Sequence, residues 1–146
     1  MINEERLLQE FLELVQIDSE TKNEGQISKV LKDKFTALGL DVYEDNAKEV
    51  TGFGAGNLIC TLPGNVEDAD TIYFTSHMDT VTPGAGVKPS IKDGYVVTDG
   101  TTILGADDKT GLSVMLEVLR VIKEKDLKHG TIQFIITVGE ESGLVG

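Results

Sequence analysis

The sequence predicts an α/β domain whose mixed, largely buried sheet is flanked by helices. Two amphipathic helical patterns precede the first strand pattern, and a third helical pattern joins the last two extended segments. The final strand pattern is apolar on nearly both sides, as expected for a central strand with covered faces. At 146 residues and 40% hydrophobic content, the chain has the length of one ordinary domain and enough apolar side chains for a core.

Two helices are expected in the first 39 residues. Asn3 can cap the first helix, and the spacing of apolar residues continues to about Ile17. A polar loop follows over residues 18–23. The second helix is predicted over residues 27–38, because Gly39 then occupies the position where a glycine commonly ends a helix.

The rest of the chain alternates between extended and helical patterns. Strands are predicted over residues 40–44, 57–62, 71–76 and 131–138, and a turn at 92–95 leads into an extended segment through Val97. A well-buried helix is predicted from Thr110 to about Glu124. The glycine-rich segment 52–56 precedes a strand rather than a helix, so it is interpreted as a flexible connection and not as a phosphate-binding loop.

The composition of the chain argues against several classes of function. The chain has 13 basic and 25 acidic residues, a net charge of −12, which opposes binding to nucleic acid or to anionic lipid. No apolar run approaches the roughly 20 residues that span a bilayer, and no secretory signal pattern is present, so a cytoplasmic protein is expected. The single cysteine, Cys60, excludes a disulfide within the chain and is interpreted as a small buried apolar side chain.

Three short acidic clusters follow predicted extended segments and contain the candidate metal-binding and catalytic residues. They span residues 76–81, 105–111 and 139–143. In open α/β sheets, sites gather beyond the carboxyl ends of strands, so His77, Asp107, Glu140 and Glu141 could meet at one edge. An imidazole with carboxylates and no thiolate suits zinc, manganese or cobalt. Asp79 could orient His77, and adjacent glutamates could divide metal binding from proton transfer.

Each cluster also has a simpler explanation. A single histidine at a strand end is usually a hydrogen-bonded structural residue. Asp107 and Asp108 precede a predicted helix, and Asp108 in particular suits an N-cap. Glu140 and Glu141 could form a solvated turn. Composition and spacing alone leave both the metal site and the structural interpretation open.

The three clusters taken together resemble the signatures of a known superfamily. Ser-His-Met-Asp-Thr-Val, Gly-Ala-Asp-Asp-Lys-Thr-Gly and Gly-Glu-Glu-Ser-Gly, in this order, are similar to motifs of the dizinc metallopeptidases and deacylases. That superfamily includes peptidase T, glutamate carboxypeptidase and succinyl-diaminopimelate desuccinylase. The form Ala-Asp-Asp-Lys-Thr-Gly is closer to the peptidase T-like tripeptidases than to the deacylases. The resemblance covers essentially the whole chain.

The resemblance implies a role for each candidate residue. His77 would bind one metal ion, Glu141 the other, and Asp107 would bridge the two. Glu140 would be the general base and acid, and Asp79 would orient His77. The implied cofactor is two zinc ions, with manganese or cobalt as alternatives.

The resemblance also implies a substrate class and a domain organisation. The leading hypothesis is a zinc-dependent exopeptidase for short peptides, and more specifically a tripeptide aminopeptidase; an N-acyl amino acid deacylase or carboxypeptidase with the same site is the alternative. Residues 1–146 would be the N-terminal part of the catalytic domain. The rest of that domain, two further ligands and a lid or dimerisation domain are absent, which leaves a homodimeric parent open and predicts that this chain alone is inactive.

Overall fold

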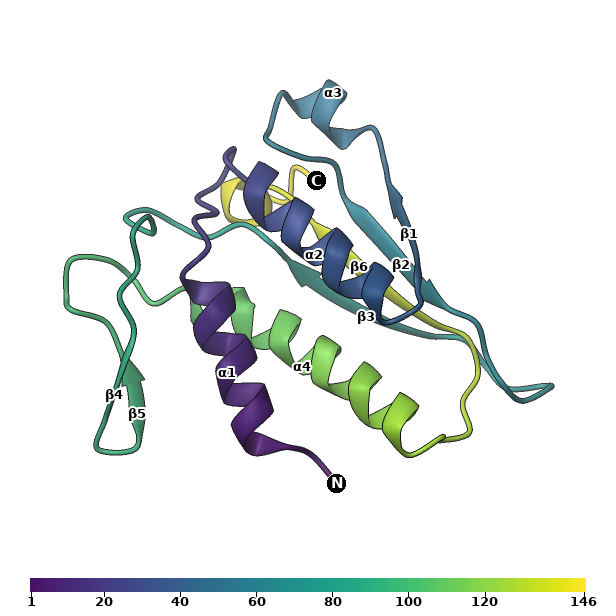
Figure 1. The fold of residues 1–146 in the computed structure, drawn as a ribbon. Coiled ribbons are helices and arrows are strands. Elements are labelled where there is room, and N and C mark those ends of the chain that lie inside the picture. The colour runs from purple at the N-terminus through teal and green to yellow at the C-terminus, as the bar shows by residue number, and fades with distance from the viewer.

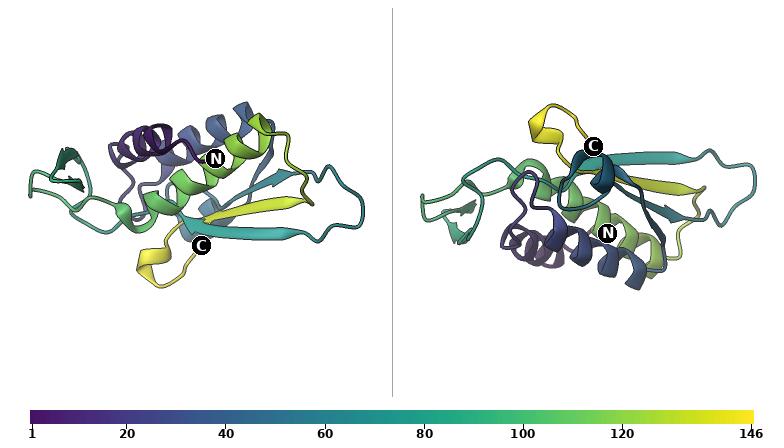
Figure 2. Two further views of the ribbon diagram at one scale, coloured as in Figure 1. Left: turned by 90° about the horizontal axis from the view of Figure 1, so that it is seen from below. Right: turned by 90° about the horizontal axis from the view of Figure 1, so that it is seen from above.

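The computed structural model describes all 146 residues, and a layer of helices lies against one face of a four-stranded sheet (Figure 1). The helices are α1 (Glu4–Val15), α2 (Gly25–Ala37), α3 (Ala47–Thr51), α4 (Ala106–Glu124) and the short 3-10 helix η1 (Glu140–Ser142). The strands are β1 (Asp41–Glu44), β2 (Leu58–Leu62), β3 (Ile72–His77), β4 (Ser90–Lys92), β5 (Tyr95–Val97) and β6 (Ile132–Thr137). Both views of Figure 2 place α1, α2 and α4 on the same side of the sheet.

The main sheet is mixed, as predicted. Its strand order is β1-β2-β6-β3, in which β1–β2 and β2–β6 are antiparallel and β3–β6 are parallel. The strand that is apolar on nearly both sides, β6, is central and alternates between buried and half-buried residues. The register of the parallel pair sets His77 beside Thr137, so the chain leaves β3 and β6 at the same end of the sheet.

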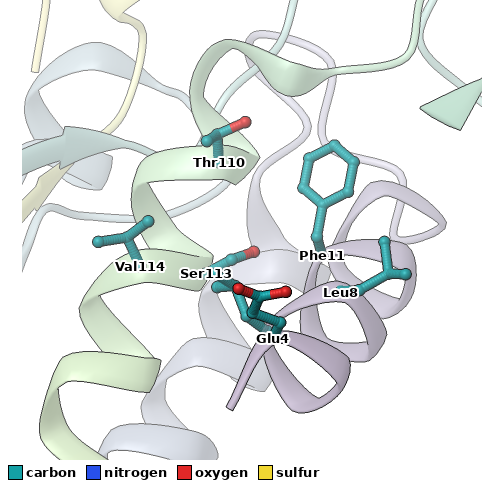
Figure 3. Close-up of a pocket in the computed structure, with 7 residues that line it drawn as sticks. Glu4, Leu8, Phe11, Thr110, Ser113 and Val114 are labelled. Carbon is teal, nitrogen blue, oxygen red and sulfur yellow. The ribbon is translucent and has the colours of Figure 1, made fainter. Parts of the chain in front are cut away.

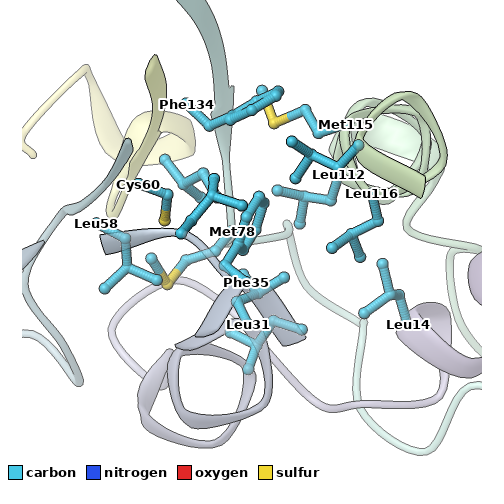
Figure 4. Packing of buried hydrophobic residues seen from close by; sticks show 14 of the residues in the cluster. Leu14, Leu31, Phe35, Leu58, Cys60, Met78, Leu112, Met115, Leu116 and Phe134 are labelled. Carbon is cyan, nitrogen blue, oxygen red and sulfur yellow. The ribbon is translucent and has the colours of Figure 1, made fainter. Parts of the chain in front are cut away.

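A single core forms where the three long helices meet the sheet. Phe134 of β6 lies near Phe35 of α2 and stacks on Phe74 of β3, with ring centroids 5.7 and 5.5 Å apart, respectively. The buried cluster draws on α1, α2, α4, β2 and β6 and on Met78 just after β3, and it includes Leu14, Leu31, Leu58, Cys60, Met78, Leu112, Leu116 and Phe134 (Figure 4). Burial raises the pKa of the Cys60 thiol to about 12, so this residue is the buried apolar side chain that the sequence predicted.

Local signals define the ends of the helices as expected. The Asn3 side chain accepts a hydrogen bond from the Arg6 backbone N–H at 3.0 Å and caps α1. Gly39 has a φ of 85° and follows Leu38, the C-cap of α2. Asp107 and Asp108 have non-helical backbone angles inside the assigned bounds of α4, so its regular part begins close to the predicted start at Thr110.

Two segments differ from the sequence prediction. The helix α3 was not predicted, because five residues are too few to display an apolar period. The connection over residues 52–56 is anchored rather than flexible: the Gly54 N–H donates to the buried carboxylate of Glu24 at 3.1 Å, and the Gly56 N–H donates to Glu44 at 2.9 Å. A Cβ at Gly54 would lie 2.5 Å from the Glu24 backbone nitrogen, so this close approach requires glycine.

The predicted turn at residues 92–95 is confirmed and belongs to a β4–β5 hairpin. This hairpin lies apart from the main sheet and projects from the body of the molecule (Figures 1 and 2). None of the helices combines the length and the apolar character that crossing a membrane would require.

Candidate metal centre

His77 is the last residue of β3, and its ring is held from both sides. The side chain is about nine-tenths buried. Nδ1 lies 2.8 Å from the backbone carbonyl oxygen of Asp79, and Nε2 lies 2.9 Å from Oδ1 of Asp107. Because a carbonyl oxygen can only accept, Nδ1 carries a proton, which leaves Nε2 as the atom directed at the carboxylates.

Three carboxylates surround Nε2 of His77. Ligand atoms of His77, Asp107 and Glu141 all lie within 4.8 Å of one another. The nearest oxygen of Glu140 is 3.9 Å from the same imidazole nitrogen. Thus the structure brings together the ends of β3, of the loop before α4, and of β6, which the sequence analysis expected to meet at one edge of the sheet.

Asp79 is the fourth carboxylate and is fully buried beneath the other three. Its Oδ1 accepts the Glu140 N–H at 3.0 Å, and its Oδ2 accepts the Glu141 N–H at 3.2 Å. Oδ1 is also 3.5 Å from Nδ1 of His77, although the closer contact to the ring comes from the Asp79 backbone carbonyl. Asp79 therefore links the cluster on β3 to the cluster that follows β6.

Asp108 lies outside the group that faces His77. Its Oδ1 accepts the Gly111 N–H at 2.9 Å, which is an N-cap contact at the start of the regular part of α4. Its Oδ2 accepts the Ser76 hydroxyl at 2.6 Å. The interpretation of Asp108 as a capping residue is confirmed, and the Ser76 bond further ties the start of α4 to the end of β3.

The electrostatics of the cluster reflect a surplus of negative charge. The carboxylates of Asp79 and Asp107 outweigh burial and raise the pKa of His77 to about 9. Burial, followed by repulsion from Asp107, raises the pKa of Glu141. Neither lysine nor arginine forms an ion pair with Asp79, Asp107, Glu140 or Glu141.

The donor set fits a divalent cation. An imidazole nitrogen and several carboxylate oxygens converge, the second imidazole nitrogen is fixed by a carbonyl, and the surrounding charge is negative. No thiolate is available, since Cys60 is buried within β2. These ligands suit zinc, manganese or cobalt rather than a thiolate-bound structural site.

A hollow of about 410 Å³ adjoins the candidate ligands. Asp107 and Glu141 form its polar side, and Val81, Ile103 and Leu104 contribute apolar walls. A separate groove of about 280 Å³ lies between α1 and α4, where Leu8, Phe11 and Val114 line it (Figure 3). Its polar groups belong to Glu4, Thr110 and Ser113, and it contains none of the candidate ligands.

The N-terminal polar loop contributes a residue that the sequence analysis did not single out. The Thr21 hydroxyl donates to Oδ2 of Asp79 at 2.7 Å. Thr21 belongs to none of the acidic motifs and lies 58 residues before Asp79 in the sequence. The contact depends on the docking of residues 19–21 along Thr80, which local patterns do not reveal.

This fold and this arrangement of residues are those of a metallopeptidase catalytic domain. Residues 57–146 match the model of Peptidase family M28, and the chain belongs to this family. The family-level expectation from the three motifs is thereby confirmed.

Individual relatives resemble the chain along its whole length. The crystal structure of aminopeptidase PepT from Bacillus cereus ATCC 10987 is 71% identical with a TM-score of 0.98, covering 99% of this chain and 39% of that one. A tripeptidase structure from Staphylococcus aureus subsp. aureus mu50 is 64% identical with a TM-score of 0.97, covering 100% and 39%. The protein YqjE of Bacillus subtilis (strain 168) is 69% identical over 146 residues, all of this chain. The chain spans 39% of the length of that relative.

Proposed function

We propose that the protein is a metal-dependent exopeptidase that hydrolyses short peptides, and specifically a tripeptide aminopeptidase that uses zinc. The observation that carries this proposal is the convergence of His77, Asp107 and Glu141 within 4.8 Å, with Glu140 beside them. The likeness to an aminopeptidase and to a tripeptidase, at 71% and 64% identity, supports the substrate class.

His77, Asp107 and Glu141 would hold the metal. In a two-ion site, His77 would be a ligand of one ion, Glu141 a ligand of the other, and Asp107 would serve both. When bound, zinc supplies Lewis-acid polarisation of the scissile carbonyl and makes water more acidic. The relatives are much longer than this chain, and we propose that residues 1–146 are the N-terminal part of a catalytic domain whose further ligands lie elsewhere in the protein.

Glu140 would move the proton. Its nearest oxygen lies 3.9 Å from Nε2 of His77, at the edge of the ligand group rather than within it. From there the carboxylate can accept a proton from the attacking water and deliver it to the leaving amine. The Asp79 carboxylate holds the backbone N–H groups of both glutamates, and the Asp79 carbonyl fixes the His77 ring. Asp79 would therefore orient the base and one metal ligand together.

The hollow beside the ligands would receive part of the peptide. Its apolar walls, Val81, Ile103 and Leu104, lie next to Asp107 and Glu141, so a side chain that flanks the scissile bond could pack there. We propose a cytoplasmic location, because the one cysteine is a buried free thiol and cytosolic proteins rarely depend on disulfides.

The proposal is tested by replacing Glu140 with glutamine in the complete protein. We expect turnover of a tripeptide to fall by about 10²- to 10⁴-fold, the usual contribution of general acid–base catalysis, while zinc binding is retained. Glu49→Gln, an exposed change on α3, is the matched control and should leave turnover unaltered. Unchanged turnover in Glu140→Gln would refute the assigned role. Preferred hydrolysis of N-acylated substrates over free tripeptides would instead identify a deacylase.

A further inference from the structure

The Asp79 carboxylate is a buried anion whose closest hydrogen bonds come from neutral donors, while Nδ1 of His77 lies farther away, 3.5 Å from Oδ1. It is fully inaccessible to solvent, and its two oxygens accept the Glu140 and Glu141 N–H groups at 3.0 and 3.2 Å. A buried carboxylate is costly unless each oxygen is well hydrogen-bonded. Two backbone donors, one on each oxygen, leave further acceptor capacity that another residue must fill.

Thr21 fills it with the shortest hydrogen bond to this carboxylate. The Thr21 hydroxyl is 2.7 Å from Oδ2 of Asp79 and 3.3 Å from the backbone carbonyl oxygen of Thr80. A hydroxyl has one proton to donate, and the closer, charged acceptor forms the stronger bond. The hydroxyl therefore points at Asp79, on the same oxygen that receives the Glu141 N–H.

The loop that carries Thr21 is itself fixed to the site. The Thr21 N–H donates to the Thr80 carbonyl at 3.0 Å, and the Thr80 N–H donates to the Ser19 carbonyl at 2.9 Å. The Gly84 N–H donates to the Glu20 carboxylate at 2.8 Å. Residues 19–21 thus dock along the segment that follows β3. These hydrogen bonds hold the loop in place and direct the Thr21 hydroxyl toward Asp79.

We propose that Thr21 is a positioning residue for the metal centre, acting through Asp79 on the Glu140–Glu141 turn. Its hydroxyl fixes the rotation of the Asp79 carboxylate, which in turn sets the distance of both glutamates from His77. Without that donor the carboxylate can turn about its Cβ–Cγ bond and hold the two N–H groups less firmly. The inference rests on the proposed function for its catalytic consequence, but not for the hydrogen-bond network itself.

The test compares Thr21→Val, which is nearly isosteric but lacks the hydroxyl, with Thr21→Ser, which keeps it. Thr61→Val is the matched control, because the Thr61 hydroxyl is also half-buried and bonds a side chain, that of Gln133, toward the opposite end of the sheet. The first measurement is amide hydrogen exchange at Glu140 and Glu141 in the metal-free protein. The others are zinc affinity, by competition with a chromophoric chelator, and kcat and KM for a tripeptide.

We expect Thr21→Val to accelerate exchange at both amides and to lower zinc affinity and kcat by several-fold; this is less than the roughly 10- to 100-fold cost of losing a direct hydrogen-bond partner of a metal ligand, because Thr21 acts through Asp79. KM should change little, and Thr21→Ser should restore all of these values. Wild-type exchange in Thr21→Val, or a loss in Thr21→Ser as large as that in Thr21→Val, would overturn the proposal. If the wild-type protein neither binds zinc nor cleaves peptides, the proposed function fails, and the exchange data still decide the role of Thr21.

Discussion

Two regions of the molecule gather carboxylates in opposite ways. At the end of the sheet, the side chains of Asp79, Asp107 and Glu140 share a single basic neighbour, His77. In the helix layer, buried acidic residues have lysine or arginine partners: Glu117 pairs with Arg6 at 2.8 Å, and Glu10 lies 3.3 Å from Lys34 and 3.5 Å from Arg120. The helix layer pairs these carboxylates with its own lysine and arginine side chains, whereas the carboxylates at the end of the sheet have only His77.

The ionisation of the two regions follows this difference. The guanidinium of Arg6 lowers the pKa of Glu117, whereas burial and then repulsion from Asp107 raise the pKa of Glu141. An acidic cluster alone is weak support for a metal site, because most such clusters are solvated or paired. Converging ligand atoms without a lysine or arginine partner are a stronger criterion, and the strand-end cluster satisfies it.

The largest effect expected from this contrast is the response of stability to zinc. Zinc at roughly 100 times its dissociation constant should raise the free energy of unfolding by about 2.7 kcal/mol, and chelation should reverse the gain. Urea unfolding with and without zinc measures it. His77→Ala should remove most of the gain, while Arg6→Ala should retain it. If His77→Ala gained as much stability as the wild-type protein, zinc would bind elsewhere, and the strand-end cluster would not be the metal site.

The helix layer should respond to the loss of its own cation. Arg6→Ala leaves the carboxylate of Glu117, 3% exposed, with only the Asn3 N–H at 3.0 Å as a partner. We expect a loss of about 2 kcal/mol in the free energy of unfolding, between the values for exposed and for buried ion pairs. Lys32→Ala, which breaks the more exposed pair with Glu44, is the control and should cost less than about 1 kcal/mol. Equal losses would show that burial of Glu117 carries no special cost.

The fold could be predicted from the sequence wherever periodicity or capping was locally strong. The cap at Asn3, the glycine after α2 and the central strand β6 are all present. The short helix α3 and the anchoring of residues 52–56 could not be predicted. The anchoring depends on Glu24, which lies 30 residues from Gly54 in sequence and whose carboxylate becomes a hydrogen-bond acceptor only after the chain folds.

The candidate site was predictable for a related reason. The first and third clusters lie at the ends of β3 and β6, whose parallel pairing brings them to one end of the sheet, and the second cluster lies in the loop between β5 and the regular part of α4. The motifs therefore supplied the residues that line the candidate metal site. Thr21 was not predictable, because a threonine in a polar loop has many neutral explanations. Only the docking of its loop along Thr80 gives it a partner.

The contrast also predicts a difference in acid stability. The pKa of Glu117 lies below its ordinary value of 4.5 in the folded protein, so its ion pair stabilises the fold above that pH. The contribution should disappear as the pH falls through the lowered pKa, and Arg6→Ala should lose this part of the acid dependence. The difference between the two profiles should not exceed the roughly 2 kcal/mol assigned to Arg6. Parallel unfolding profiles below pH 4.5 would contradict the pairing.

The smallest effect concerns the unbalanced region and has the opposite sign. The raised pKa of Glu141 means that its charge opposes folding in the metal-free protein at neutral pH. Glu141→Gln should therefore increase metal-free stability by a few tenths of a kcal/mol, since the side chain is partly exposed and the repulsion is screened. The same change should reduce the stabilisation by zinc. A stabilised metal-free protein with weakened zinc binding is the pattern of a residue retained for a ligand; a loss of stability in both states would make Glu141 a structural residue like Glu117.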